Sequence, residues 1–240
     1  MKLRALGTGH AFSRWPLIPP CWLIQSHKSF ALINCPPSVG ARLELLGVPI
    51  DRIGMIIPLG SAIAQIGGID EFAHIFKDSP SKPYLAAPAQ LLATLANRYD
   101  SVSKFQLKSV QKVGFKEEHL TETLTFVSNY CGSYGFRLED AKVFCSGSAE
   151  VNEDWIFKNT DCDILLHEDR PQLLELPVYL QNKLWIYGYE KPPEGTDPLP
   201  MLFMPQGSWI FDSDRRDKVM AKERYIRENS KRVIGNESSQ

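Results

Sequence analysis

The stretch that decides the fold is I-I-P-L-G-S-A-I-A-Q-I-G-G-I-D-E-F, residues 56–72. Its first residues are apolar and β-branched, which is typical of a buried strand. The glycine pair Gly67 and Gly68 then opens a segment that we expect to be a helix over residues 68–76. A strand that passes through a loop into a helix places the loop side chains where α/β proteins bind ligands. Yet the loop, residues 60–65, reads G-S-A-I-A-Q and offers no strong metal ligand.

The composition indicates an ordinary globular protein. The 240 residues are 43% hydrophobic and 23% charged, with a formal net charge of −1. This length allows one large α/β domain, and the near-neutral charge gives no general attraction to nucleic acid or acidic membranes. No segment approaches the roughly 20 apolar residues of a membrane-spanning helix, and the five cysteines form no C-x-x-C pair. We therefore expect a cytoplasmic protein with free thiols, no nucleic-acid partner and no membrane insertion.

The order of elements predicts a mixed α/β sandwich. Short strands are expected at residues 2–6, 21–25, 30–34, 52–57 and 84–87, with a helix over residues 88–99 in addition to that at 68–76. A strand-rich middle follows, in which residues 140–141 turn a hairpin, and then a buried strand ending in H-E, a helix at 173–181 and a strand at 183–189. A helix is also expected at 152–158 and a final pair of strands within residues 201–211. Strands first and then strand–helix alternation favours two sheets packed face to face with helices outside.

The sequence resembles the metallo-β-lactamase fold superfamily, and within it the ribonuclease Z and class-II cyclic-nucleotide phosphodiesterase branch. The resemblance rests on short motifs in the right order over residues 1 to 190. They are L-G-T-G-H-A-F at 6–12, F-A-L-I-N-C-P-P at 30–37, residues 56–72, K-P-Y-L-A-A-P at 82–88, Y-G-F-R-L-E-D-A-K-V-F-C-S-G-S at 134–148 and D-I-L-L-H-E at 163–168. The resemblance implies a single four-layer αββα sandwich over residues 1–211, followed by a charged C-terminal helix and tail over residues 212–240.

The resemblance also implies a dinuclear metal site, but the residues at its ligand positions do not match. Where the family has histidines and aspartates, this chain has Gly60, Ala62, Ala64, Gln65, Asn129, Ser148 and Gly188. The aspartate of the family's hairpin motif reads Asn34. Glycine and alanine supply no lone pairs, whereas a two-metal site needs several imidazole and carboxylate ligands. We therefore expect no metal or other cofactor, and no catalytic residue.

The leading hypothesis from the sequence is a non-catalytic protein that acts as a structural or regulatory module and binds a protein partner or a second copy of itself. The C-terminal segment is the candidate docking element, because apolar residues recur in it every seven positions among interleaved charges. Its candidate contact residues are Arg215, Arg216, Val219, Arg224, Ile226 and Val233.

Two alternatives stay open. In the first, a relocated site hydrolyses a phosphodiester with one metal ion held by His10, His167, Glu168 and Asp169. In the second, the old cleft binds a nucleotide as a sensor, with Arg14, Asn129 and Ser148 as candidate contacts. The possible ligand contacts in the cleft are His10, Arg14, His167 and Glu168.

Overall fold

The computed structural model describes most of the chain in two large sheets. The residues described are 1–13, 16–26, 29–116, 121–128, 133–147, 156, 158–168, 171–188, 202–203, 206–207 and 209–212. The expected helix at 152–158 falls almost entirely outside this set, and so does the expected helix over residues 212–240. No helix among the described residues is long and apolar enough to cross a membrane.

The first sheet has seven strands in the order β14-β1-β2-β3-β4-β5-β6. Its N-terminal part is an antiparallel meander of β1, β2 and β3, and β3 to β6 then run parallel to one another. The strands are β1 Lys2–Gly7, β2 Cys21–Gln25, β3 Phe30–Ile33, β4 Ile53–Ile57, β5 Tyr84–Ala87, β6 Gln106–Ser109 and β14 Trp209–Asp212.

The second sheet also has seven strands, in the order β13-β12-β11-β10-β9-β8-β7. It repeats the plan of the first, with antiparallel pairing from β7 to β10 and parallel pairing from β10 to β13. The strands are β7 Lys112–Lys116, β8 Thr121–Ser128, β9 Tyr134–Leu138, β10 Val143–Cys145, β11 Ile164–Glu168, β12 Leu184–Tyr187 and β13 Leu202–Phe203.

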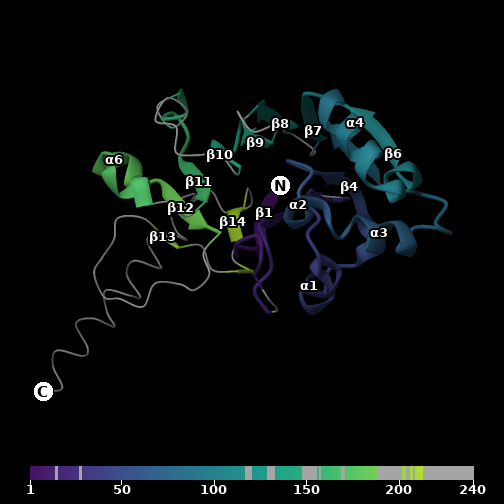
Figure 1. Cartoon of the computed structure of the whole chain (residues 1–240). Coiled ribbons are helices and arrows are strands. Elements are labelled where there is room, and N and C mark those ends of the chain that lie inside the picture. The colour runs from purple at the N-terminus through teal and green to yellow at the C-terminus, as the bar shows by residue number, and fades with distance from the viewer. Residues whose placement is uncertain are drawn as a thin grey trace, which may run out of the picture.

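The helices lie on the two outer faces, which gives the four layers of an αββα sandwich. Figure 1 shows α1, α3 and α4 beside the first sheet and α6 at the opposite side, beyond β11 and β12. The helical elements are α1 Val39–Leu45, η1 Ile50–Arg52, α2 Ile63–Ile66, α3 Ile69–Ile75, α4 Ala89–Arg98, η2 Asp100–Lys104, η3 Pro171–Glu175 and α6 Val178–Gln181. The expected fold class is therefore confirmed, as are the helices expected at 68–76 and 88–99.

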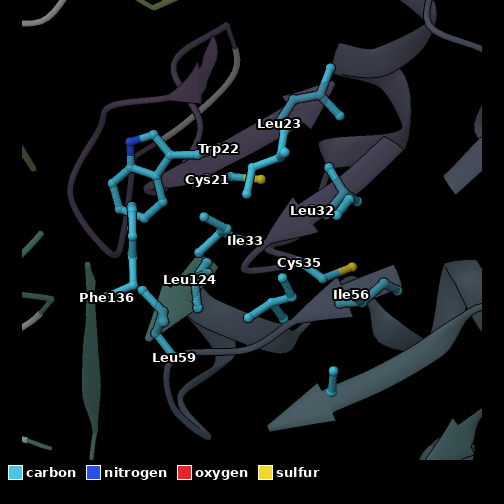
Figure 2. Close-up of a cluster of buried hydrophobic side chains, with 14 of the residues drawn as sticks. Cys21, Trp22, Leu23, Leu32, Ile33, Cys35, Ile56, Leu59, Leu124 and Phe136 are labelled. Atoms are coloured by element: carbon cyan, nitrogen blue, oxygen red, sulfur yellow. The ribbon is translucent and has the colours of Figure 1, made fainter. Parts of the chain in front are cut away.

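Side chains along the parallel strands of the second sheet point alternately to its two faces, and they form one hydrophobic core on each face. Leu166, Trp185 and Tyr187 belong to the large core between the two sheets. Leu165 and Ile186 belong to a second core that also contains residues of η3 and α6. Successive side chains of a strand point to opposite faces, so a buried sheet needs an apolar residue at almost every position. Figure 2 shows the inter-sheet core, with Trp22 of β2 close to Phe136 of β9.

Two expected elements differ from the structure. The helix expected at 173–181 is instead the 3-10 helix η3 followed by the short helix α6. Pro177 separates them, because proline has no backbone N–H and disfavours a helical residue before it. The final strands do not pair with each other: β13 lies parallel to β12, whereas β14 lies antiparallel to β1. Each strand pairs with an edge of a different sheet, which shortens the run of unpaired backbone at both edges.

The start of α3 depends on a glycine that lies against backbone. Gly68 donates its N–H to the oxygen of Cys35 at 2.8 Å, and a Cβ added at Gly68 would lie 2.5 Å from the oxygen of Pro36. We expect Gly68→Ala to lower the free energy of unfolding by about 1–3 kcal/mol, as overpacked cores do. Chemical denaturation measures the change.

Gly54→Ala is the control, because the nearest atoms to its added Cβ lie 4.0 Å away. We expect that variant to stay within about 0.5 kcal/mol of the parent. Equal stability of the two variants would contradict the close approach at Gly68.

Candidate functional site

A small pocket opens at the carboxyl ends of the central strands of both sheets. Asn34 and Leu59 follow β3 and β4 of the first sheet, and Gly147, Glu168 and Tyr187 follow or end β10, β11 and β12 of the second. Its volume of about 40 Å³ has room for a few water molecules. The remaining lining residues are Ala11, Pro20, Trp22, Ala64 and Gln65. Parallel strands of an open sheet commonly bind ligands at this end.

Asn34 ties the first sheet together on one side of the pocket. Its Nδ2 donates to the oxygen of Pro20 at 3.1 Å, and its Oδ1 accepts the N–H of Leu59 at 3.0 Å. Its backbone has a φ of 64°, a left-handed conformation that asparagine tolerates better than most residues. This side chain therefore joins the loops after β1 and β4 to the end of β3.

The loop after β4 is held from both ends. Arg98 Nη1 donates to the oxygen and to the hydroxyl of Ser61, at 2.9 and 3.1 Å. Tyr99 donates its hydroxyl to the same main-chain oxygen at 3.1 Å. On the other side, the main-chain oxygen of Gln65 accepts a hydrogen bond from the N–H of Cys35 at 2.6 Å. The C-terminal end of α4 and the segment after β3 thus fix the loop that carries Ala64 and Gln65.

Two glycines, at positions that the resemblance aligns with metal ligands, lie against neighbouring side chains. A Cβ added at Gly60 would overlap the carboxamide of Gln65. A Cβ added at Gly188 would lie 2.6 Å from Cγ of Glu168, and Gly188 has a φ of +80° that disfavours any other residue. A histidine at either position would collide with the side chain that now occupies that space.

Strand β11 sends Glu168 and His167 to opposite faces of the second sheet. Glu168 lines the pocket on the inner face, on the side of Tyr187. His167 lies in register with Ile186 of the outer core, and it is 3% exposed. Its Nδ1 donates to the main-chain oxygen of Glu168 at 2.7 Å. The structure therefore does not bring these two side chains together, although they are adjacent in the sequence.

Tyr187 and Trp22 form the aromatic wall of the pocket. Their rings meet edge to face, with centroids 5.2 Å apart and planes at 90°. The Tyr187 hydroxyl donates to the oxygen of Gly147 at 2.8 Å, and burial raises the pKa of Tyr187 well above its usual value. Burial likewise raises the pKa of Cys145, which lies 3.5 Å from that hydroxyl, to about 12. Both groups therefore stay protonated at neutral pH, and neither is set up as a nucleophile.

The described residues do not fit the dinuclear metal centre that the fold family implies. Among them, no group of three or more histidine, cysteine, aspartate or glutamate side chains is arranged to hold a metal ion. At the described ligand positions, Gly60, Ala62 and Ala64 have no donor atoms, and the space beside Gly60 and Gly188 is filled. One carboxylate and two carboxamides in the lining are too few for two metal ions.

The other residues singled out in the sequence lie apart from this pocket or outside the described set. His10 follows β1, and its Nδ1 accepts the N–H of Phe12 at 3.0 Å, so it caps a turn beside the lining residue Ala11. The residues outside the description are Arg14, Asn129, Ser148, Asp169 and all six C-terminal candidates, Arg215, Arg216, Val219, Arg224, Ile226 and Val233. Protein binding through that C-terminal segment stays a prediction.

Sequence reasoning did not single out Trp22 or Tyr187. Both lie inside apolar runs, C-W-L-I-Q and L-W-I-Y, where an aromatic residue reads as ordinary core. The feature that could have identified them is the polar group of each side chain, the phenol of Tyr187 and the indole N–H of Trp22. A polar group buried in an apolar run needs a hydrogen-bond partner.

Comparison with known proteins places the fold. No family model matches the chain, and no curated protein sequence matches it.

Solved structures do match. They include the metallo-β-lactamase fold protein YhfI from Bacillus subtilis, at 16% identity and a TM-score of 0.62, over 81% of this chain and 87% of that one. A diphosphatase of the PhnP family matches at 15% identity and a TM-score of 0.67, over 87% and 95%. The short form of human tRNase Z matches at 14% identity and a TM-score of 0.61, over 88% and 99%. The chain has the metallo-β-lactamase fold.

These neighbours correct one expectation from the sequence. The chain was expected not to be an enzyme, but the solved structures with its fold include a diphosphatase and a tRNase Z. This finding contradicts the expectation. Its physical weakness is that missing histidines argue only against metal chemistry, whereas the pocket is still lined by the carboxylate of Glu168.

The hydrogen bonds of Asn34 generate a stability prediction. Asn34→Ala removes the acceptor of the Leu59 N–H and places a Cβ-bearing residue without compensation at a φ of 64°. We expect a loss of about 2–4 kcal/mol in the free energy of unfolding from these two effects together. Asn34→Gly removes the same bonds but tolerates the backbone, so it should lose about 1 kcal/mol less.

The control is Asn97→Ala on the exposed face of α4, which should change stability by no more than about 0.5 kcal/mol. If Asn34→Ala and Asn97→Ala unfold at the same denaturant concentration, the role given to Asn34 is wrong.

Proposed function

We propose that the chain is a phosphoester hydrolase whose reaction takes place in the pocket between the two sheets, with Glu168 as the general base. The observation that carries the proposal is the position of Glu168, the one carboxylate among the described lining residues, at the end of a central parallel strand. The fold and the names of the structural neighbours, a diphosphatase and a tRNase Z, support the choice of phosphoesters.

The proposed step is attack by water. A water molecule in the pocket, which has volume for it, gives a proton to the carboxylate of Glu168. Its oxygen forms a bond to phosphorus while the bond from phosphorus to the ester oxygen breaks. The proton then leaves Glu168 for the departing alcohol or phenol, so the carboxylate is restored. No metal ion takes part in this step.

Neutral donors would stabilise the charge on the phosphoryl oxygens. The indole N–H of Trp22 finds no acceptor among the described residues, and Trp22 lines the pocket at 1% exposure. A buried donor without an acceptor costs free energy. For this N–H to reach an oxygen of a bound phosphoester, the Trp22 side chain must shift on binding, because the nitrogen itself is inaccessible in this structure. The carboxamide of Gln65 lies in the same lining and carries a second N–H donor. Because neutral donors stabilise charge less than metal ions do, we expect slow turnover.

The test replaces Glu168 by its neutral isostere. We expect the purified chain to hydrolyse bis(4-nitrophenyl) phosphate, measured as released 4-nitrophenolate, with and without chelator. Glu168→Gln should lower kcat at least about 100-fold, which is the typical loss when a general base is removed.

Glu44→Gln on the exposed face of α1 is the matched control and should keep full activity. Full activity of Glu168→Gln would remove Glu168 from the proposal. No turnover by the parent chain above the uncatalysed rate would overturn the proposed function.

A further inference from the structure

The strand β6 ends the first sheet with an open edge. It is the last strand in the order of that sheet and lies parallel to β5, and Figure 1 shows it on the side of the molecule opposite to α6. All four of its residues are exposed, and the apolar residue Leu107 is 50% exposed. The outer edge of such a strand presents unpaired backbone groups, with which another chain can pair.

The hydrogen bonds to β5 show which backbone groups of β6 point outward. The N–H groups of Gln106 and Val110 donate to main-chain oxygens at the two ends of β5, at 3.3 and 3.0 Å. In a parallel ladder alternate residues bond to the same neighbour, so the main-chain groups of Lys108 also face β5. Those of Leu107 and Ser109 therefore point to the open side. They have no hydrogen-bond partner in the part of the chain that the structure describes.

The segment that contains this edge carries only positive charge. Residues 101–116 include four lysines and no aspartate or glutamate. Lys104 precedes β6, Lys108 lies within it and Lys112 begins β7, and all three are exposed. None of the three forms an ion pair with another described residue. Lys108 instead lies over the ring of Tyr84, with its Nζ 5.7 Å from the ring centroid. The edge is therefore locally positive, although the chain has a net charge of −1.

The lysines decide which kind of strand fits the edge. A second copy of β6 would bring lysines beside lysines, and like charges on adjacent strands destabilise their pairing. A strand with glutamate or aspartate residues would place carboxylates beside the same ammonium groups, and opposite charges on adjacent strands stabilise their pairing. The edge therefore disfavours a copy of itself and favours an acidic strand, which gives specificity by repulsion as well as by attraction.

We propose that the open edge of β6 binds an acidic, extended segment of a partner protein, which joins the first sheet as a further strand. The outward main-chain groups of Leu107 and Ser109 bond to the segment, and Lys104, Lys108 and Lys112 contact its carboxylates. In such strand addition the main chain supplies affinity and the side chains supply specificity. Because β5 separates β6 from β4 and the pocket, the inference does not depend on the proposed function.

Two short peptides test the charge preference of the edge. One alternates glutamate and valine, the other alternates lysine and valine, and each carries fluorescein for fluorescence anisotropy. We expect the chain to bind the acidic peptide at least about ten-fold more tightly than the basic one, with an affinity that falls as salt is added. Equal affinity for the two peptides, or no binding of the acidic one, overturns the inference.

A proline variant distinguishes strand addition from attraction between charges alone. Leu107→Pro removes an outward N–H and keeps every hydrogen bond to β5, and proline is tolerated in an edge strand whose N–H faces solvent. We expect this variant to bind the acidic peptide at least about ten-fold more weakly, because the main-chain ladder supplies the affinity. An unchanged affinity would mean that the peptide does not add as a strand and would contradict the proposal.

Charge reversal tests the lysines. The double variant Lys108→Glu, Lys112→Glu should lose the preference for the acidic peptide and bind the basic one more tightly. The control is Lys158→Glu, an exposed lysine two residues after Ile156 of the outer core of the second sheet. We expect the control to keep the parent affinity. An equal loss in the control and the double variant would mean that the net charge of the chain matters and the edge does not.

Hydrogen exchange gives a readout that needs no variant. The acidic peptide should slow exchange of the Leu107 and Ser109 amides at least about ten-fold in NMR spectra, because both amides would then be hydrogen-bonded. No slowing at these two amides would contradict the proposal even if the proline variant does not fold. Two other occupants are checked in parallel. A parent chain that dimerises in sedimentation velocity and is monomeric as Leu107→Pro, or one that binds oligouridylate more tightly than the acidic peptide, would also overturn it.

Discussion

The contact between Glu168 and Gly188 is the constraint on which the rest of the pocket depends. The Cγ atom of Glu168 occupies the space that a side chain at position 188 would need. The carboxamide of Gln65 occupies the corresponding space beside Gly60. A folded interior has almost no spare volume, so each glycine and the side chain that covers it form one unit. The carboxylate and the carboxamide are consequently fixed at the pocket, which is why we assign its chemistry to them.

The surrounding structure supports these two side chains from both sheets. Tyr134 donates its N–H to Leu59, and Gly188 donates its N–H to Thr8, so main-chain hydrogen bonds link the two sheets close to the pocket. Asn34 and the Arg98–Tyr99 pair then hold the loops of the first sheet. Such bonds position a site because the strands beneath it are rigid. The site is therefore a property of the whole sandwich rather than of one motif.

The sequence predicted the sandwich because its signals are local and repeat. The apolar runs, the glycine pair at 67–68 and the hairpin at 140–141 each predict a helix, a strand or a turn. The order of these elements along the chain predicts the fold. Strict alternation along the predicted strand already implies that His167 and Glu168 point to opposite faces, but the hypothesis of a relocated metal site placed them together. The sequence could not predict that Gln65 fills the space at Gly60, or that β14 joins the first sheet, because both depend on residues brought together only by folding. The inference of a non-catalytic protein failed for a related reason, since it weighed only the residues that were missing.

The central claim is that the positions of a dinuclear metal centre are taken by Gln65 and Glu168. The most direct measurement is the amount of zinc, manganese and iron bound per chain, by plasma mass spectrometry, in protein purified without chelators and dialysed against metal-free buffer. The account predicts fewer than two tightly bound metal ions per chain. Two retained ions per chain, lost together when Glu168 is replaced, would contradict it.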